Sequence, residues 1–195
     1  MGAVHPEYAA RCLPGCFPLV LVMVTAMRIS FDVDDTLVMH DAPVPREIVV
    51  PWYWRWRYPE PLRLGTKALM HALQERKCEI WIYTTSFRQP RYMRGWFKTF
   101  GVTLTSVVNQ EVHDLHVKKA QFPGYTPSKY PPAFGIDLHV DDSEGVAMEG
   151  REHGFRVVVV SPSDLDWTVR VLAAVDELLK ASSPFSPGNP GERGN

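Results

Sequence analysis

Short apolar segments alternate along the chain with longer segments in which apolar residues recur at helical spacing. The apolar segments cover residues 28–32, 79–83, 102–108, 136–140 and 155–160, and their lengths are typical of strands. Helical spacing marks residues 62–76, 89–100, 144–152 and 166–180. Because strands alternate with helices, the pattern predicts an α/β fold with a parallel sheet covered by helices. The consecutive valines at 157–160 further predict a strand that is buried on both faces.

The length of 195 residues suits one domain with a substantial core, and the composition is ordinary for a globular protein. We expect this domain to cover residues 27–180. Residues 12–27 are apolar and follow Arg11, but two prolines and a glycine interrupt them. We therefore expect residues 1–26 to be an extension, with a secretory signal as the alternative. The Pro, Gly and Ser residues of 181–195 predict a disordered tail.

The three cysteines indicate a reducing environment. Cys12 and Cys16 have no second pair that would complete a zinc site, and Cys78 lies far away in the sequence. Neither a disulfide framework nor a membrane partner is expected, and the predicted location is the cytoplasm.

Two carboxylates follow the first predicted strand. Asp32 and Asp34 lie in the sequence Phe-Asp-Val-Asp-Asp-Thr-Leu at 31–37. Alternate residues of an extended chain point the same way, so both side chains can project from the edge of the sheet where α/β folds place their active sites. Two carboxylates that converge repel each other unless a cation lies between them. Mg²⁺ with phosphate chemistry is the simplest candidate, and a solvated Asp-rich turn is the alternative.

This segment resembles the first motif of the haloacid dehalogenase (HAD) superfamily, which is Asp-x-Asp-x-Thr after a hydrophobic strand. The resemblance implies that Asp32 is a nucleophile that becomes an aspartyl-phosphate. It also implies that Asp34 is the general acid and base, with a backbone carbonyl that helps to bind Mg²⁺. Thr36 would support the loop.

Three later segments resemble the remaining HAD motifs. The hydroxyl that holds the phosphoryl oxygens is assigned to Thr84, the first residue after the second strand, with Thr85 in reserve. The lysine that neutralises the phosphoryl group is assigned to Lys129, because it immediately precedes the segment that leads into the fourth strand. Lys118 and Lys119 are the other candidates, with surface charge as their alternative role.

The last motif is an acidic pair after the fourth strand, Asp141 and Asp142. The resemblance implies that these acids complete the metal shell together with Asp32 and the carbonyl of Asp34. Asp142 is assigned as the direct ligand, and Asp141 as a ligand through water or a neighbour of the ligands. The pair can also cap the helix that follows.

The four motifs occur in order across residues 28–160. They imply a Rossmann-like three-layer α/β/α sandwich with a parallel five-stranded sheet in the order 5-4-1-2-3. They also imply Mg²⁺-dependent hydrolysis of a phosphoric monoester. A phosphotransferase of the same family is one alternative. A metal-containing, non-catalytic module that binds nucleic acid or protein is another.

The chain has no room for a large cap domain, so the site is expected to be open to a phosphorylated small molecule or macromolecule, and a homo-oligomer could supply a lid. A small insertion at about 38–60 contains aromatic residues interleaved with arginine. Such residues stack on bases and pair with phosphates, so Trp54, Arg55 and Arg57 are assigned to substrate binding with Thr85. The excess of Lys and Arg in residues 46–131 likewise favours an anionic substrate. A miniature core, a dimer contact and nucleic-acid binding are the alternatives for the insertion.

The histidines carry weaker signals. His113 and His116 are expected to be polar surface residues of a loop after the third strand, because no third metal ligand lies near them in the sequence. His139 is expected to pack within or beside the fourth strand.

Overall fold

Five parallel strands form one sheet in the order β3-β2-β1-β4-β5, which confirms the predicted topology. The computed structural model describes residues 26–40, 43–47, 52–117, 122 and 125–182. The strands are β1 (Arg28–Phe31), β2 (Glu79–Tyr83), β3 (Ser106–Val108), β4 (Leu138–Asp141) and β5 (Val157–Val159).

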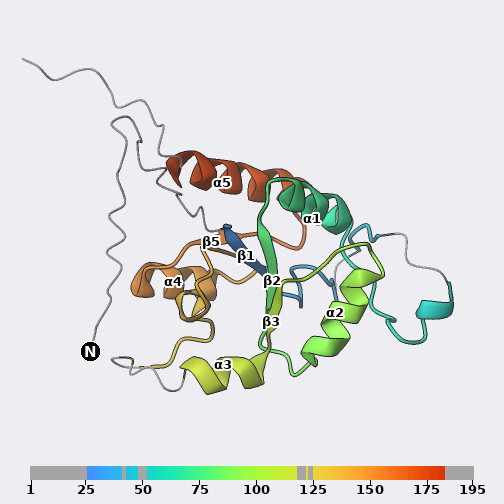
Figure 1. Ribbon diagram of the computed structural model, residues 1–195, viewed down its shortest axis with the longest axis horizontal. Helices are drawn as coiled ribbons and strands as arrows, with labels where there is room; N and C mark the ends of the chain where they lie inside the picture. Colours follow the sequence, from blue (N-terminus) through green and yellow to red (C-terminus); the bar gives the residue numbers. More distant parts are fainter. Residues whose placement is uncertain (1–25, 41–42, 48–51, 118–121, 123–124, 183–195) are drawn as a thin grey trace, which may run out of the picture.

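Helices connect the strands and complete an α/β sandwich. They are α1 (Thr66–Glu75), α2 (Pro90–Lys98), α3 (Gln110–Val117), α4 (Glu144–His153) and α5 (Trp167–Ser182), with short 3-10 turns η1 (Trp52–Trp54) and η2 (Pro131–Phe134). Helices α1 and α5 contact each other and lie side by side along the top of Figure 1. None of the helices in the described ranges is long and apolar enough to cross a membrane.

The two faces of the sheet differ in chemistry because side chains alternate along each strand. One face, which includes Ile29, Ile80 and Leu138, belongs to the large apolar core beneath α1, α2 and α5. The opposite face carries Ser30 and His139 on the central strands, with a smaller apolar cluster around Tyr83. The sheet therefore offers one apolar face for stability and one partly polar face that leads to the site.

Several element boundaries differ from the sequence prediction. The helix expected at 62–76 begins at Thr66, because Leu64 and Gly65 form a turn in which Gly65 adopts a positive φ of 92°. The third and fifth strands are shorter than predicted. The valines Val157–Val159 are only partly buried, because β5 is the edge strand of the sheet. The prediction of burial on both faces was therefore wrong for these three valines, whereas Val160, just after the strand, is buried.

A helix replaces the loop expected after the third strand. Residues Gln110–Val117 form α3, in which His113 and Val117 are the buried residues. The prediction that His113 is a surface residue was wrong, because its Nδ1 lies 2.6 Å from the buried hydroxyl of Tyr83. Leu115, whose apolar side chain would be expected inside, is exposed instead. Because a histidine lies on the buried face of α3, the spacing of apolar residues in the sequence does not indicate this helix.

Other predictions fall largely or wholly outside the described residues. Residues 1–25 hold almost all of the predicted extension, and residues 183–195 hold most of the predicted tail. Lys118 and Lys119 also lie outside the described residues, as do Cys12 and Cys16. The first two residues assigned to the tail, Ala181 and Ser182, instead complete the last turn of α5.

Candidate active site

The site lies at the carboxyl end of the two central strands. Asp32 directly follows β1, and Asp141 is the last residue of β4. The strands are in register at Phe31 and Val140, and the backbone N–H of Asp32 donates to the carbonyl of Val140 at 2.9 Å. Because the strands are parallel neighbours, two acids that are far apart in the sequence meet at one edge of the sheet.

Lys129 connects these two acids. Its Nζ lies 2.7 Å from Oδ1 of Asp32 and 2.5 Å from Oδ2 of Asp141. All three side chains are buried, with 3% of Lys129 exposed. Burial alone would lower the pKa of this lysine, but the two carboxylates outweigh burial and raise its pKa. Lys129 is therefore a buried ammonium ion shared between two carboxylates.

The pKa of Asp32 is raised by its surroundings. Burial, followed by the nearby charge of Asp141, raises the pKa of its carboxyl to about 6, although Lys129 pulls it down. A pKa of about 6 still leaves most of Asp32 ionised at neutral pH, which is the form that a carboxylate nucleophile requires.

A buried histidine supports Asp141 from the polar face of the sheet. His139 Nδ1 lies 2.7 Å from Ser30 Oγ, and Nε2 lies 2.9 Å from Asp141 Oδ2. Burial lowers the pKa of His139, so the ring is neutral. The consistent arrangement is that Nε2–H donates to the carboxylate while the hydroxyl of Ser30 donates to Nδ1. The sequence pattern placed His139 in or beside the strand but gave no sign of this chain of hydrogen bonds.

Asp141 accepts three donors. Lys129 and His139 bind Oδ2, and the backbone N–H of Ser143 donates to Oδ1 at 2.9 Å. Although burial opposes ionisation, these hydrogen bonds and charges hold the pKa of Asp141 well below its usual range. Most of the hydrogen-bond acceptor capacity of Asp141 is therefore used within the protein. This fits the assignment of Asp142, and not Asp141, as the direct metal ligand.

Asp32, Asp141 and Asp142 offer carboxylate oxygens that all lie within 4.8 Å of one another. Asp142 is only partly buried, and among the described contacts its Oδ1 accepts the hydroxyl of Thr36 at 3.2 Å. Burial and the adjacent charge of Asp141 raise the pKa of Asp142. Oxygen ligands crowded in this way suit a hard divalent cation such as Mg²⁺, which would relieve their repulsion. The residues present thus fit the expected metal.

Asp34 is bound on the outer side of the site. Arg88 donates to both of its oxygens, from Nη1 to Oδ2 at 2.8 Å and from Nη2 to Oδ1 at 2.9 Å, and His40 Nε2 lies 2.9 Å from Oδ1. Burial raises the pKa of Asp34, but these hydrogen bonds outweigh it and lower the pKa overall. Arg88 is also paired with Glu60, from Nη2 to Oε1 at 2.6 Å. Neither Arg88 nor His40 nor Glu60 stood out in the sequence, because none belongs to a motif.

Thr84 and Thr85 lie at the same edge of the sheet, immediately after β2. Thr84 is buried, and its Oγ1 accepts the backbone N–H of Ser86 at 3.2 Å. Thr85 is exposed, and together with Ser128 it lines a pocket on the surface. The hydroxyl of Thr84 is therefore the one held in a fixed position next to β1, while Thr85 faces solvent.

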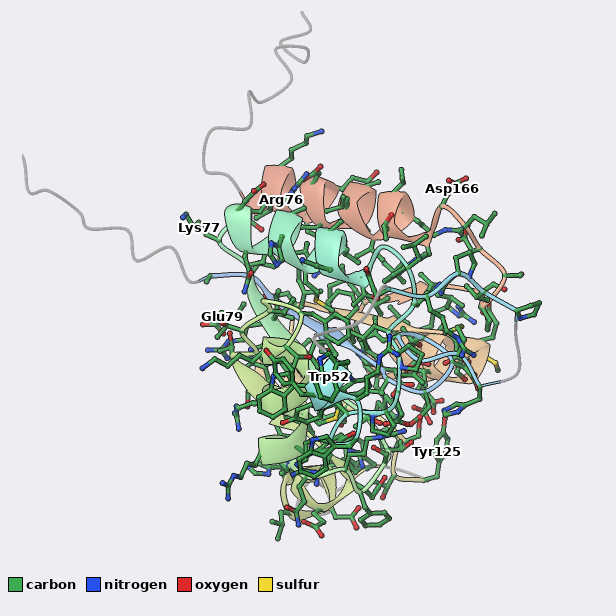
Figure 2. All side chains as sticks on the ribbon, turned by 90° about the vertical axis from the view of Figure 1, so that its right-hand side faces the viewer. Trp52, Arg76, Lys77, Glu79, Tyr125 and Asp166 are labelled. Carbon is green, nitrogen blue, oxygen red and sulfur yellow. The ribbon has the colours of Figure 1, made fainter. Side chains whose placement is uncertain are left out.

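The insertion projects from the sheet beside α2. Its turn η1 lies at the right edge of Figure 1, and Trp52 stands toward the viewer in Figure 2. Trp54 and Arg55 are exposed and do not line any of the described pockets. Arg57 differs, because it lines a pocket that also includes Arg88. The structure therefore separates the three residues that the sequence grouped together.

The strand order, with Asp32 after β1 and the acidic pair at the end of β4, is the arrangement that the four motifs imply. The fold thus agrees with the one that the HAD resemblance implies. No protein-family model matches the chain, and no curated protein matches it.

Two solved structures are similar to this chain. One is a protein of Porphyromonas gingivalis described as a HAD-like family hydrolase, at 11% identity over 80% of this chain and 98% of that chain, with a TM-score of 0.40. The other is a protein of Vibrio cholerae assigned as a 3-deoxy-D-manno-octulosonate 8-phosphate phosphatase, at 15% identity over 78% of this chain and 86% of that chain, with a TM-score of 0.39.

Proposed function

We propose that the chain is a Mg²⁺-dependent phosphatase that hydrolyses a phosphoric monoester through an aspartyl-phosphate. One observation carries the proposal: the buried ammonium of Lys129 binds Asp32 at 2.7 Å, while Asp141 and Asp142 gather their oxygens beside it. A structural ion pair would need one carboxylate. An excess of negative charge around one lysine instead fits a site that receives a metal cation and then a phosphoryl group.

Each residue has a role in this proposal. Asp32 Oδ attacks phosphorus, and the bond from phosphorus to the ester oxygen breaks. Asp34 delivers a proton to the departing oxygen and later removes one from the water that cleaves the aspartyl-phosphate. Lys129 and the hydroxyl of Thr84 stabilise the charge on the transferring phosphoryl group.

Mg²⁺, when bound by Asp32, Asp142 and the backbone carbonyl of Asp34, would neutralise charge on the phosphoryl oxygens. Asp141 then serves mainly to hold Lys129 in place. The contacts of Asp34 add a condition, because all of them favour its ionised form. To carry a proton to the leaving oxygen, Asp34 must first exchange at least one contact with Arg88 or His40.

The test is release of inorganic phosphate from a panel of aryl and alkyl phosphates by the full chain, with Mg²⁺ or with EDTA. Asp32→Asn should abolish release. The matched control Asp176→Asn should not, because Asp176 lies on α5 and pairs with Arg76. Arg76 precedes β2, so this pair lies at the amino end of the strands, away from the site. Release that persists in Asp32→Asn would refute the covalent mechanism. Absence of release from every ester, by folded protein, would favour the binding module instead.

A further inference from the structure

A pocket of about 410 Å³ adjoins Asp34 on the side of the insertion. Its walls come from Arg57, Glu60, Arg88, Gln89 and Tyr92. Arg88 belongs both to this pocket and to the contacts of Asp34. In the proposed function Asp34 faces the departing ester oxygen, so the remainder of the substrate, the leaving group, has this pocket next to it.

The two arginines of the pocket differ in their partners. Arg88 is matched by Asp34 and by Glu60, which lies 2.6 Å from it. Arg57 has no carboxylate partner among the described residues, and its guanidinium carbon instead lies 5.3 Å from the ring centroid of Tyr92 and 5.6 Å from that of Tyr58. Stacking on aromatic rings holds a guanidinium in place without neutralising it. The guanidinium of Arg57, unlike that of Arg88, therefore has hydrogen-bond donors that a ligand can reach.

The position of Arg57 is anchored to α2. The neighbouring Tyr58 is buried, and its ring lies 5.1 Å from that of Tyr92. The hydroxyl of Tyr58 approaches Gly95 so closely that a Cβ there would lie 2.1 Å from it. Because this contact requires glycine, the insertion is fastened to the helix at the residue next to Arg57. The backbone that carries Arg57 is thus held against α2, next to the pocket that Arg57 lines.

We propose that this pocket binds the leaving group of the phosphomonoester, and that Arg57 selects a leaving group with a second anionic oxygen group, a carboxylate or a phosphate. The inference rests on the proposed function and adds the substrate class. A planar guanidinium binds such groups through two parallel hydrogen bonds, which an uncharged group of the same shape cannot match. Tyr92 supplies an apolar wall for the carbon skeleton between the two charges.

The experiment uses phenyl phosphates that differ at the para position: carboxylate, phosphonate, carboxamide and aminomethyl. The quantity measured is kcat/KM with Mg²⁺, expressed as the ratio of each charged ester to the carboxamide so that Arg57 variants are compared on one scale. Wild type should prefer the anionic esters, and Arg57→Gln should lower that ratio about tenfold, the size of one charge-assisted contact. Arg57→Glu should shift preference to the aminomethyl ester. Comparison of carboxylate with phosphonate tells which anion fits.

Arg94→Gln is the matched control, because Arg94 is an exposed residue of the same helix as Tyr92 and lies outside the pocket wall. Its ratios should equal those of wild type. If all esters are hydrolysed and Arg57→Gln leaves the ratios unchanged, the role of Arg57 is refuted but the proposed phosphatase activity is supported. If wild type hydrolyses none of the esters, the proposed phosphatase activity is refuted. Calorimetric binding of 4-hydroxybenzoate against 4-hydroxybenzamide then tests the pocket alone, and equal affinities in wild type and Arg57→Gln would overturn it.

Discussion

Replacing Lys129 with methionine removes a charge from the centre of the site and leaves its shape almost unchanged. Asp32 and Asp141, both buried, would then face each other without the ammonium that lies 2.7 and 2.5 Å from them. Removing one partner of a buried ion pair costs about 3–5 kcal/mol, because the remaining charge stays buried without compensation. That is a large share of the roughly 5–15 kcal/mol that stabilises an ordinary domain.

The assay is urea or thermal unfolding of wild type and Lys129→Met in EDTA. The expected loss lowers the melting temperature by roughly 6–20 °C for a chain of this size. Lys67→Met is the control, since Lys67 is exposed on α1 and the same substitution there should change stability by less than about 0.5 kcal/mol. Mg²⁺ should restore part of the loss, by about 2.7 kcal/mol at one hundred times its dissociation constant.

Two results would refute this reasoning. A loss below about 1 kcal/mol in EDTA would mean that the carboxylates do not depend on Lys129 for compensation. An equal Mg²⁺ effect on wild type and on Lys129→Met at the same Mg²⁺ concentration would mean that the metal does not bind where the lysine charge acts. The first result would remove the electrostatic argument for the site, and the second would remove the argument for the metal.

Three further predictions concern separate parts of the molecule. Asp142→Asn should weaken Mg²⁺ binding by calorimetry on the order of tenfold or more with little change in stability, whereas Asp141→Asn should lower stability even in EDTA. Equal effects would contradict their different roles. Gly95→Ala should cost about 1–3 kcal/mol in urea unfolding through overpacking against Tyr58, and the loss should shrink in a Tyr58→Phe background. Burial raises the pKa of the Cys78 thiol, so less thiolate is present at pH 8. Its alkylation by iodoacetamide, followed by peptide mass spectrometry, should therefore be slow in native protein and fast in urea; equal rates would contradict its burial.

Local patterns in the sequence predicted the fold class and most of its elements. The apolar segments alternating with helical spacing predicted the parallel sheet, because each strand is short and each helix presents an apolar stripe to the core. The order of the sheet followed from the resemblance. Apolar spacing did not reveal α3, whose buried face contains His113 in place of an apolar residue. The run of valines also overstated the burial of β5, since no local pattern says which strand lies at an edge.

The candidate residues at strand ends could be predicted from the sequence for a physical reason. A residue that follows a parallel strand lies at the carboxyl edge wherever that strand sits in the sheet. The strand pattern therefore put Asp32 at that edge, and the HAD resemblance singled out Thr84 and Asp141 at the ends of two other strands. Lys129 was selected by its position ahead of the fourth strand. Their assigned roles remain predictions that the assays above test.

Tertiary structure alone decided which residues contact each other across the chain. Ser30 and His139 meet because β1 pairs with β4, and Arg88 reaches Asp34 across 54 residues of sequence. Arg57 became distinct from Arg55 only because Tyr58 anchors it over α2. Such contacts depend on the register of strands and the packing of loops on helices. A sequence pattern records the spacing of residues along the chain, whereas these distances arise only when distant segments are folded together.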